Sequence, residues 1–187
     1  LRRLELLLPT LPARLPGQTF HPAQGARRGR VALFLGCVAR VLDAETLAAA
    51  IRLLTRLGFD VVIPQNQTCC GALQREAGRS GQAQVLARHN LDAFRAAGVD
   101  VVITTASGCD AVLADSGKND GTSTERRIRV LDIHQFLADA ALPASMTLAP
   151  LPVTIAVQDP CSLRNALRAE QAVYALLGRI PAARIVP

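Results

Sequence analysis

Short apolar runs alternate with longer amphipathic stretches along most of the chain. Four runs are nearly continuous in apolar residues, which is typical of strands buried on both faces of a parallel sheet: residues 30–37, 59–64, 99–109 and 151–161. The stretches between them predict helices at residues 43–58, 80–97, 129–142 and 168–178, with one or two helical turns at 110–117. This alternation predicts an α/β fold of βαβ repeats, with a parallel sheet and helices on both faces.

Three segments fall outside this pattern. Residues 1–30 are rich in Pro, Arg and Gly and predict a linker, whereas the polar residues 118–127 predict a loop. The last residues, "AARIVP", predict the beginning of a strand. The chain begins with Leu and its only Met is Met146, so we expect a piece of a longer protein. No apolar window approaches about 18 residues, so no membrane span is expected, and no secretory signal is visible.

The charge of the chain changes this picture little. The formal net charge is +6 and the pI is about 9.7, values that can indicate a nucleic-acid partner. However, the arginines are scattered and aromatic residues make up only 3% of the chain, so stacking groups for bases are scarce. The charge instead predicts a solvated basic surface or a docking face for an acidic partner, and no nucleic acid.

The cysteines carry the candidate chemistry. There are five of them, an odd number, which argues against a disulfide framework. Four lie just beyond the carboxyl end of a predicted strand: Cys37, Cys69, Cys109 and Cys161. Because ligands of open α/β sheets bind at those strand ends, we expect four strands to deliver thiols to one edge of one sheet.

The spacing of these thiols indicates a site assembled by the fold. Soft thiolates gathered in this way suit an iron–sulfur cluster or zinc. The adjacent pair Cys69 and Cys70 suits a larger cluster better than one tetrahedral ion, because neighbouring side chains diverge. Gly36, Gly71 and Gly108 beside the cysteines would let the backbone approach such a cluster. The alternative is that the thiols are small buried hydrophobic groups.

Other polar residues are weaker candidates. Gln67, Thr68 and Ser107 stand next to the cysteines and could donate hydrogen bonds to cluster sulfur. The histidines are scattered, so we expect His89 and His134 to be surface or packing groups. No dinucleotide fingerprint, P-loop or nucleophile elbow is present, so neither nucleotide binding nor hydrolysis is expected and no catalytic residue is assigned.

The motifs "FLGC", "CCG", "TASGC" and "QDPC" resemble those of the cysteine-rich CCG domain. That domain occurs in the iron–sulfur subunit of glycolate oxidase, in the B subunit of heterodisulfide reductase and in lactate-utilisation proteins. The resemblance implies that residues 31–140 are a first cysteine-rich repeat and that residues 150–187 begin a second one. Residues 1–30 would then be the linker that follows a ferredoxin-like module.

The resemblance also implies a function. The chain would be an iron–sulfur electron-transfer subunit of a flavin-dependent complex that oxidises a 2-hydroxy acid, in the cytoplasm, where the complex could associate with the inner face of the membrane. Its metal ligands would be Cys37, Cys69, Cys70 and Cys109 in the first repeat, for a 4Fe–4S cluster, and Cys161 as the first ligand of the second repeat. One departure is Ala106, which occupies the first position of the family's Cys-x-x-Cys. Two alternatives stay open: a protein that reduces a disulfide at its cluster, and a non-redox assembly domain.

Overall fold

A computed structural model describes residues 17–118, 127–140, 142 and 146–186. Five strands form one sheet in the order β1-β3-β2-β4-β5. Their bounds are β1 Phe20–His21, β2 Gly29–Leu33, β3 Phe59–Val62, β4 Val101–Thr104 and β5 Arg129–Asp132. Strands β2 to β5 are parallel, while β1 pairs antiparallel with β3. The predicted parallel α/β sheet is therefore confirmed, with a short antiparallel strand added at one edge.

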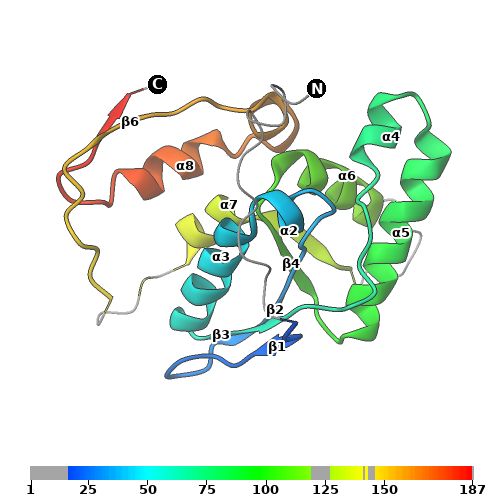
Figure 1. Cartoon of the computed structure of the whole chain (residues 1–187), viewed down its shortest axis with the longest axis horizontal. Helices are drawn as coiled ribbons and strands as arrows, with labels where there is room; N and C mark the ends of the chain where they lie inside the picture. The colour runs from blue at the N-terminus through cyan, green and yellow to red at the C-terminus, as the bar shows by residue number, and fades with distance from the viewer. Residues whose placement is uncertain (1–16, 119–126, 141, 143–145, 187) are drawn as a thin grey trace, which may run out of the picture.

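Helices cover both faces of this sheet, as predicted (Figure 1). One face carries α3 (Ala44–Arg56) and α7 (Ile133–Asp139), and the other carries α5 (Ser80–Ala96) and α6 (Ser107–Lys118). Two short helices, α2 (Ala39–Leu42) and α4 (Ala72–Glu76), follow the ends of β2 and β3. Neither short helix was expected from the sequence.

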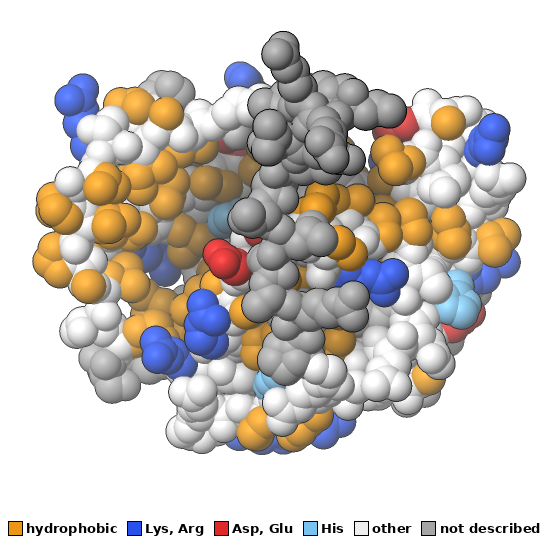
Figure 2. Space-filling model, in the orientation of Figure 1, with side chains coloured by type: hydrophobic (Ala, Val, Ile, Leu, Met, Phe, Trp, Pro, Cys, Tyr) orange, Lys and Arg blue, Asp and Glu red, His pale blue; other side chains and the backbone are white. Residues whose placement is uncertain are grey.

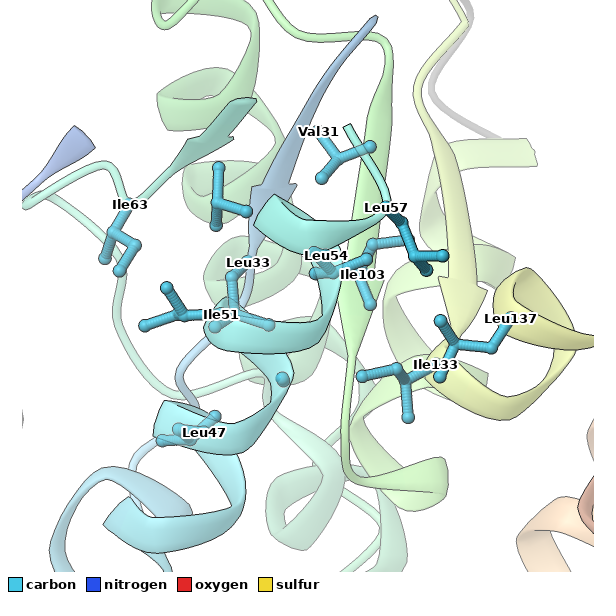
Figure 3. Packing of buried hydrophobic residues seen from close by; sticks show 12 residues of the cluster. Val31, Leu33, Leu47, Ile51, Leu54, Leu57, Ile63, Ile103, Ile133 and Leu137 are labelled. Atoms are coloured by element: carbon cyan, nitrogen blue, oxygen red, sulfur yellow. The ribbon is translucent and has the colours of Figure 1, made fainter. Parts of the chain in front are cut away.

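The first core lies between the sheet and helices α3 and α7 (Figure 3). Helix α3 points Leu47, Ile51 and Leu54 at the sheet, a spacing that follows the helical repeat. Leu47 and Leu54 are fully buried, and so is Leu33 of β2 against them. Burying a leucine side chain contributes about 1.5–3 kcal/mol, so this face anchors β2 firmly.

The second core lies on the opposite face, between the sheet and helices α5 and α6. Phe34, just after β2, meets Phe94 of α5 edge to face, with ring centroids 6.3 Å apart. Leu91 and Leu113 complete the packing from α5 and α6. Cys70 is buried in this core, so the Cys-Cys turn is attached to the apolar interior.

The C-terminal part forms a separate small unit. It contains β6 (Thr154–Ala156), the π-helix η2 (Ser162–Leu167), α8 (Glu170–Leu177) and β7 (Arg184–Val186). Strands β6 and β7 pair in parallel in a two-stranded sheet of their own. Helix α8 packs against α7 and η2 packs against α6, so this unit lies along one side of the five-stranded domain (Figure 1).

Residues 129–142 were expected to form one helix, and this expectation was wrong. The segment begins as strand β5 and only then becomes helix α7. Val130 packs into one core and Leu131 against the other, because successive residues of a strand face opposite sides of the sheet. Pairing with β4 and burial on both faces therefore outweigh the local helical spacing.

The expected fourth strand of the sheet at residues 151–161 also differs. Only Thr154–Ala156 form a strand, and that strand pairs with β7 and not with the five-stranded sheet. The predicted final strand does form, as β7. Helix α6 is longer than the one or two turns expected, because it begins at Ser107. The predicted loop at 118–127 lies mostly outside the described residues.

The surface is mixed in character. Lys and Arg side chains are spread over the face shown in Figure 2, while hydrophobic side chains gather over α8 and β6. Leu148, Leu151 and Val153, which precede β6, are among the exposed large hydrophobic residues. Within the described residues, every helix is too short or too polar to cross a membrane.

Candidate metal centre

Three strand ends bring four cysteines to one pocket. Cys37 follows β2, Cys69 and Cys70 follow β3, and Cys109 lies in the first turn of α6 after β4. All four line a pocket of about 360 Å³, here called the thiol pocket. Because β3, β2 and β4 are neighbours in the sheet, their carboxyl ends lie side by side. The predicted convergence of thiols is confirmed for these three strand ends.

The four thiols are arranged as two pairs. The sulfur of Cys37 lies 3.6 Å from that of Cys69, and the sulfur of Cys70 lies 2.9 Å from that of Cys109. The adjacent residues Cys69 and Cys70 thus point to different partners. The turn distributes its two thiols between the loop after β2 and the beginning of α6.

Their environments differ as well. A hydrogen bond from the Cys109 thiol, against the opposing effect of burial, lowers the pKa of Cys70 to about 6. The same hydrogen bond, together with burial, raises the pKa of Cys109. This hydrogen bond therefore favours the thiolate form of Cys70. Thiolates are the form that binds metal.

Gly71 brings backbone close to the thiols. Its N–H points at the sulfur of Cys69 at 3.4 Å. Burial raises the pKa of Cys69, and this N–H opposes that effect. Gly71 has φ +89°, and a Cβ there would lie 2.8 Å from the backbone of Ala83 in α5. Glycine is thus required for both the turn and the helix that packs beneath it.

Gly36 and Gly108 also line the thiol pocket. Gly36 has φ +68° in the turn between β2 and Cys37. Gly108 is in the first turn of α6, where a Cβ would meet no atom within 4 Å. This placement is compatible with the prediction that both glycines lie close to a cluster. Their role as cofactor contacts stays a prediction.

Gln67 has a structural role that differs from the one expected. Its buried side chain donates to the carbonyl of Leu33 at 3.0 Å and accepts from the N–H of Leu35 at 2.9 Å. Gln67 therefore ties the segment before the Cys-Cys turn to the end of β2, and its amide is occupied by backbone. Ser107 likewise bonds elsewhere, to the hydroxyl of Ser162 at 2.7 Å.

Asn90 of α5 was not singled out from the sequence. Its fully buried side chain accepts from the N–H of Thr68 at 2.8 Å and donates to the carbonyl of Cys69 at 3.0 Å. It thereby holds the Cys-Cys turn against the helix. The sequence does contain a signal that could have identified Asn90. Helical spacing places this polar residue on the apolar face of the helix, beside Ala87 and Leu91.

Cys161 does not join the other cysteines, which corrects the expectation of four thiols at one edge of one sheet. It is exposed, it follows β6 of the two-stranded sheet, and it lies outside the lining of the thiol pocket. The physical reason is strand pairing, because β6 pairs with β7 in a sheet of its own and not with the five-stranded sheet.

The donor set of the thiol pocket fits an iron–sulfur cluster. Cys thiolates are the usual ligands of such clusters, and separate thiolates bind separate irons. The remaining walls are largely apolar, with Phe34, Leu35 and Val38 among them, which provides a low-dielectric surrounding. Ala106 lines the same pocket at the place of the family's further thiol. Within the described residues, no group of three or more His, Cys, Asp or Glu is arranged so that it could hold a metal ion.

Comparison with known proteins agrees with this site. Residues 31–114 match the family model described as "Cysteine-rich domain". The chain carries a cysteine-rich domain. This cysteine-rich domain spans β2 to α6 and contains all four cysteines of the thiol pocket.

Curated relatives extend the similarity beyond this domain. The chain is 34% identical over 177 residues to the probable glycolate oxidase iron–sulfur subunit of Bacillus subtilis, covering 89% of this chain and 40% of that protein. It is 31% identical over 192 residues to the glycolate oxidase iron–sulfur subunit of Escherichia coli, covering 94% of this chain and 47% of that protein. It is 29% identical over 171 residues to the B subunit of fumarate reductase (CoM/CoB) of Methanothermobacter marburgensis, covering 91% and 33%. The chain thus spans less than half the length of each.

Proposed function

We propose that this chain is part of an iron–sulfur electron-transfer subunit and that the thiol pocket binds a 4Fe–4S cluster. The observation that carries the proposal is the meeting of four thiols from three strand ends in one apolar pocket. The ligands are Cys37, Cys69, Cys70 and Cys109. Two of the named relatives are a probable and a named glycolate oxidase iron–sulfur subunit, which supports the same assignment.

The residues of the pocket have separate tasks in this proposal. A bound cluster supplies one-electron redox chemistry, and the protein sets its potential through ligands, hydrogen bonds and dielectric. The Gly71 N–H supplies a hydrogen bond toward the sulfur of Cys69. Phe34 and Leu35 exclude water from one side. Gln67 and Asn90 fix the two cysteine-bearing turns through backbone hydrogen bonds.

The C-terminal unit fits the beginning of a second cysteine-rich repeat. In the first repeat, β2 is followed by Cys37, then by helices, then by the parallel neighbour β3. In the second unit, β6 is followed by Cys161, then by helices, then by the parallel neighbour β7. Helix α8 is rich in apolar residues yet has no buried one, as expected of a helix that lacks part of its core. Cys161 would be a ligand of that second repeat.

The partner in this proposal is a flavoprotein that oxidises a 2-hydroxy acid of the glycolate or lactate type. The names of the relatives support it, since they include glycolate oxidase subunits and lactate utilization protein A. Electrons would pass from the flavin through the cluster, and the substrate would not touch this chain. The complex would lie in the cytoplasm, at the inner face of the membrane.

Anaerobic reconstitution with iron and sulfide tests the proposal. We expect a brown protein with about four irons and four sulfides per chain, whose broad visible absorption falls on reduction as an EPR signal appears. The double variant Cys69→Ser/Cys70→Ser should stay colourless under the same conditions. Stoichiometric zinc in a colourless wild-type protein, with no iron bound after reconstitution, would contradict the proposal.

A second candidate is a protein that reduces a disulfide at its cluster. The similarity to the B subunit of fumarate reductase (CoM/CoB) is the observation that favours it. Ala106 in place of a further thiol makes the first repeat less suited to it. A disulfide compound that changes the EPR signal of the reduced cluster would support this candidate, and an unchanged signal would leave electron transfer as the assignment.

A further inference from the structure

The C-terminal unit repeats the element order of the first domain. In the first domain, β2 is followed by Cys37, the short helix α2, the helix α3 and the parallel strand β3. In the C-terminal unit, β6 is followed by Cys161, the short helix η2, the helix α8 and the parallel strand β7. Helix η2 is therefore the counterpart of α2, and α8 is the counterpart of α3.

The two short helices have different surroundings. Helix η2 packs against α6 of the first domain, and there the Ser107 and Ser162 hydroxyls lie 2.7 Å apart. Leu163 of η2 is buried. Helix α2 packs against α3 of its own domain, and none of its four residues is buried. Helix η2 is thus covered by the other unit in a way that α2 is not.

The outer face of α2 is apolar. Val38, at the N-cap, and Val41 and Leu42 within the helix are spaced i, i+3 and i+4, so they share one side. Their exposed fractions are 56%, 49% and 51%. Large aliphatic side chains that gather in this way on a surface are typical of an interaction site. These three residues are here called the α2 face.

The two units meet through the same face. In the first domain, α3 and α7 cover one face of the sheet. Because parallel βαβ crossovers are right-handed, α8 covers the corresponding face of the β6–β7 sheet. Helix α8 packs against α7, and in Figure 1 it lies between β6 and the first domain. Each unit therefore turns its α3-type helix toward the other unit.

A contact between like faces is symmetric. Two copies of one fold that meet through the same face are related by a two-fold axis, so each contact occurs twice with the partners exchanged. The contact between α6 and η2 thus predicts a second contact, between α2 and the second repeat's counterpart of α6. A head-to-tail arrangement would not repeat the contact and would leave the α2 face in water.

We propose that the α2 face is the docking site for the counterpart of α6 in the second repeat. This helix would follow β7, and the relatives are long enough to contain it, since the chain covers 40% of the Bacillus subtilis protein and 47% of the Escherichia coli protein. The inference rests on the proposed second repeat and not on the proposed cluster. Val38 also lines the thiol pocket, so the docked helix covers one side of that pocket and keeps water from it.

Photo-cross-linking in the full-length protein tests this contact. The photoreactive residue p-benzoylphenylalanine replaces Val41, and mass spectrometry identifies the peptide to which it attaches. We expect an intramolecular cross-link to a helix after residue 187 that carries a cysteine in its first turn, as α6 carries Cys109. The matched control is the same replacement of Val85, which is 69% exposed on α5 and should give no cross-link to that helix.

Other occupants of the α2 face would give other products. A cross-link from residue 41 to a second copy of the protein would show self-association, and one to residues 1–16 would show that the chain covers this face itself. Either product in place of the expected one would overturn the proposal. The absence of any cross-link from residue 41 would overturn it as well.

Stability gives a second measurement. Val41→Glu should lower the urea midpoint of the full-length protein by about 1 M, because the docked helix would bury a glutamate without a partner. In the 187-residue chain, where the α2 face is exposed, the same change should have little effect. Val85→Glu should have little effect in both proteins. Equal shifts for Val41→Glu in the two proteins would contradict docking by the second repeat.

The outcomes separate this inference from the proposed cluster, because neither measurement needs iron. The expected cross-link in a protein that never takes up iron would keep the two-fold arrangement and reject the cluster. A normal cluster in a protein whose residue 41 gives no cross-link to the second repeat would keep the cluster and reject the arrangement.

Discussion

At the scale of single residues, neighbours in sequence have different surroundings. Cys70 is 2% exposed and pairs with Cys109 in the second core, whereas the half-buried Cys69 pairs with Cys37. Side chains of adjacent residues diverge, so two vicinal thiols can bind two irons of one cluster but are poorly placed for a single ion.

Gly71→Ala should destabilise the fold strongly. A left-handed backbone costs a non-glycine residue about 1–2 kcal/mol, and the new Cβ would lie 2.8 Å from the Ala83 backbone. Gly78 is the matched control, since its φ is +75° but a Cβ there meets no atom within 4 Å. Urea unfolding should show a larger decrease in the free energy of unfolding for Gly71→Ala than for Gly78→Ala. Equal losses would show that contact with α5 is unimportant.

Asp60 should make stability depend on pH at the acidic end. The Ala23 N–H and then the Arg27 guanidinium, 2.7 Å away, hold the pKa of this β3 carboxyl below its usual value. A lowered folded-state pKa gives stability that is present above about pH 4, the ordinary pKa of Asp, and is lost as pH falls toward the lowered value. At pH 7 the wild-type protein should therefore unfold at a higher urea concentration than Asp60→Asn. The difference between the two urea midpoints should be smaller at pH 3.

Asp92 provides the control for this prediction. It pairs with Arg95 on the surface of α5 and is 63% exposed, so solvent screens the interaction. Asp92→Asn should leave the urea midpoint nearly unchanged at both pH values. A constant gap between wild type and Asp60→Asn across the same range would contradict the role of Asp60.

At the scale of elements, helix α5 does two things at once. Its apolar side, with Ala87, Leu91 and Phe94, packs into the second core. Its one buried polar residue, Asn90, forms hydrogen bonds with the backbone N–H of Thr68 and the backbone carbonyl of Cys69. The position of the Cys-Cys turn is therefore set by a helix that contributes no thiol.

Asn90→Ala should loosen the thiol pocket as well as the fold. The change removes the partner of the Thr68 N–H and leaves the Cys69 carbonyl with only the long bond from the Thr68 hydroxyl at 3.5 Å, at a cost on the order of 2 kcal/mol. We expect a lower urea midpoint and less iron retained after anaerobic reconstitution and gel filtration. Gln84→Ala, on the exposed side of the same helix, is the control and should change neither. Wild-type iron content in Asn90→Ala would show that the turn is held by other contacts.

At the scale of the whole molecule, the division into two sheets determines which cysteines lie in the same pocket. Strands β3, β2 and β4 are adjacent, so their ends supply the thiol pocket. Strand β6 belongs to the other sheet, and η2 joins the two units through the hydroxyls of Ser107 and Ser162. A pocket lies at this junction, lined by Thr105 and His134 of the first domain and by Val157 and Val173 of the C-terminal unit, so it forms only where the two units pack together.

Cys161→Ser should leave the cluster of the first repeat unchanged. The exposed Cys161 lies outside the thiol pocket, so its loss removes none of the four proposed ligands. Cys109→Ser should by contrast abolish or strongly reduce iron binding. Iron and sulfide content and the EPR signal measure both variants. Loss of the cluster in Cys161→Ser would show that this cysteine is a ligand of the same site.

Sequence alone was sufficient where a local pattern and the tertiary environment agree. The long helices α3 and α5 and the strands β2, β3 and β4 were predictable, because their apolar spacing matches the faces that they bury. The cysteines at the ends of those strands were predictable for the same reason, since parallel strands end at a common edge.

Only the tertiary structure decided the remaining features, because each depends on which strands pair. Pairing with β4 makes residues 129–132 a strand, and pairing with β7 removes Cys161 from the first site. The burial of Asn90, the division of Cys69 and Cys70 between two partners, and the pocket beside His134 arise from contacts between distant segments. Hydrophobic spacing along the chain specifies which face of an element is buried, but the element that covers that face is set by the packing of the whole chain.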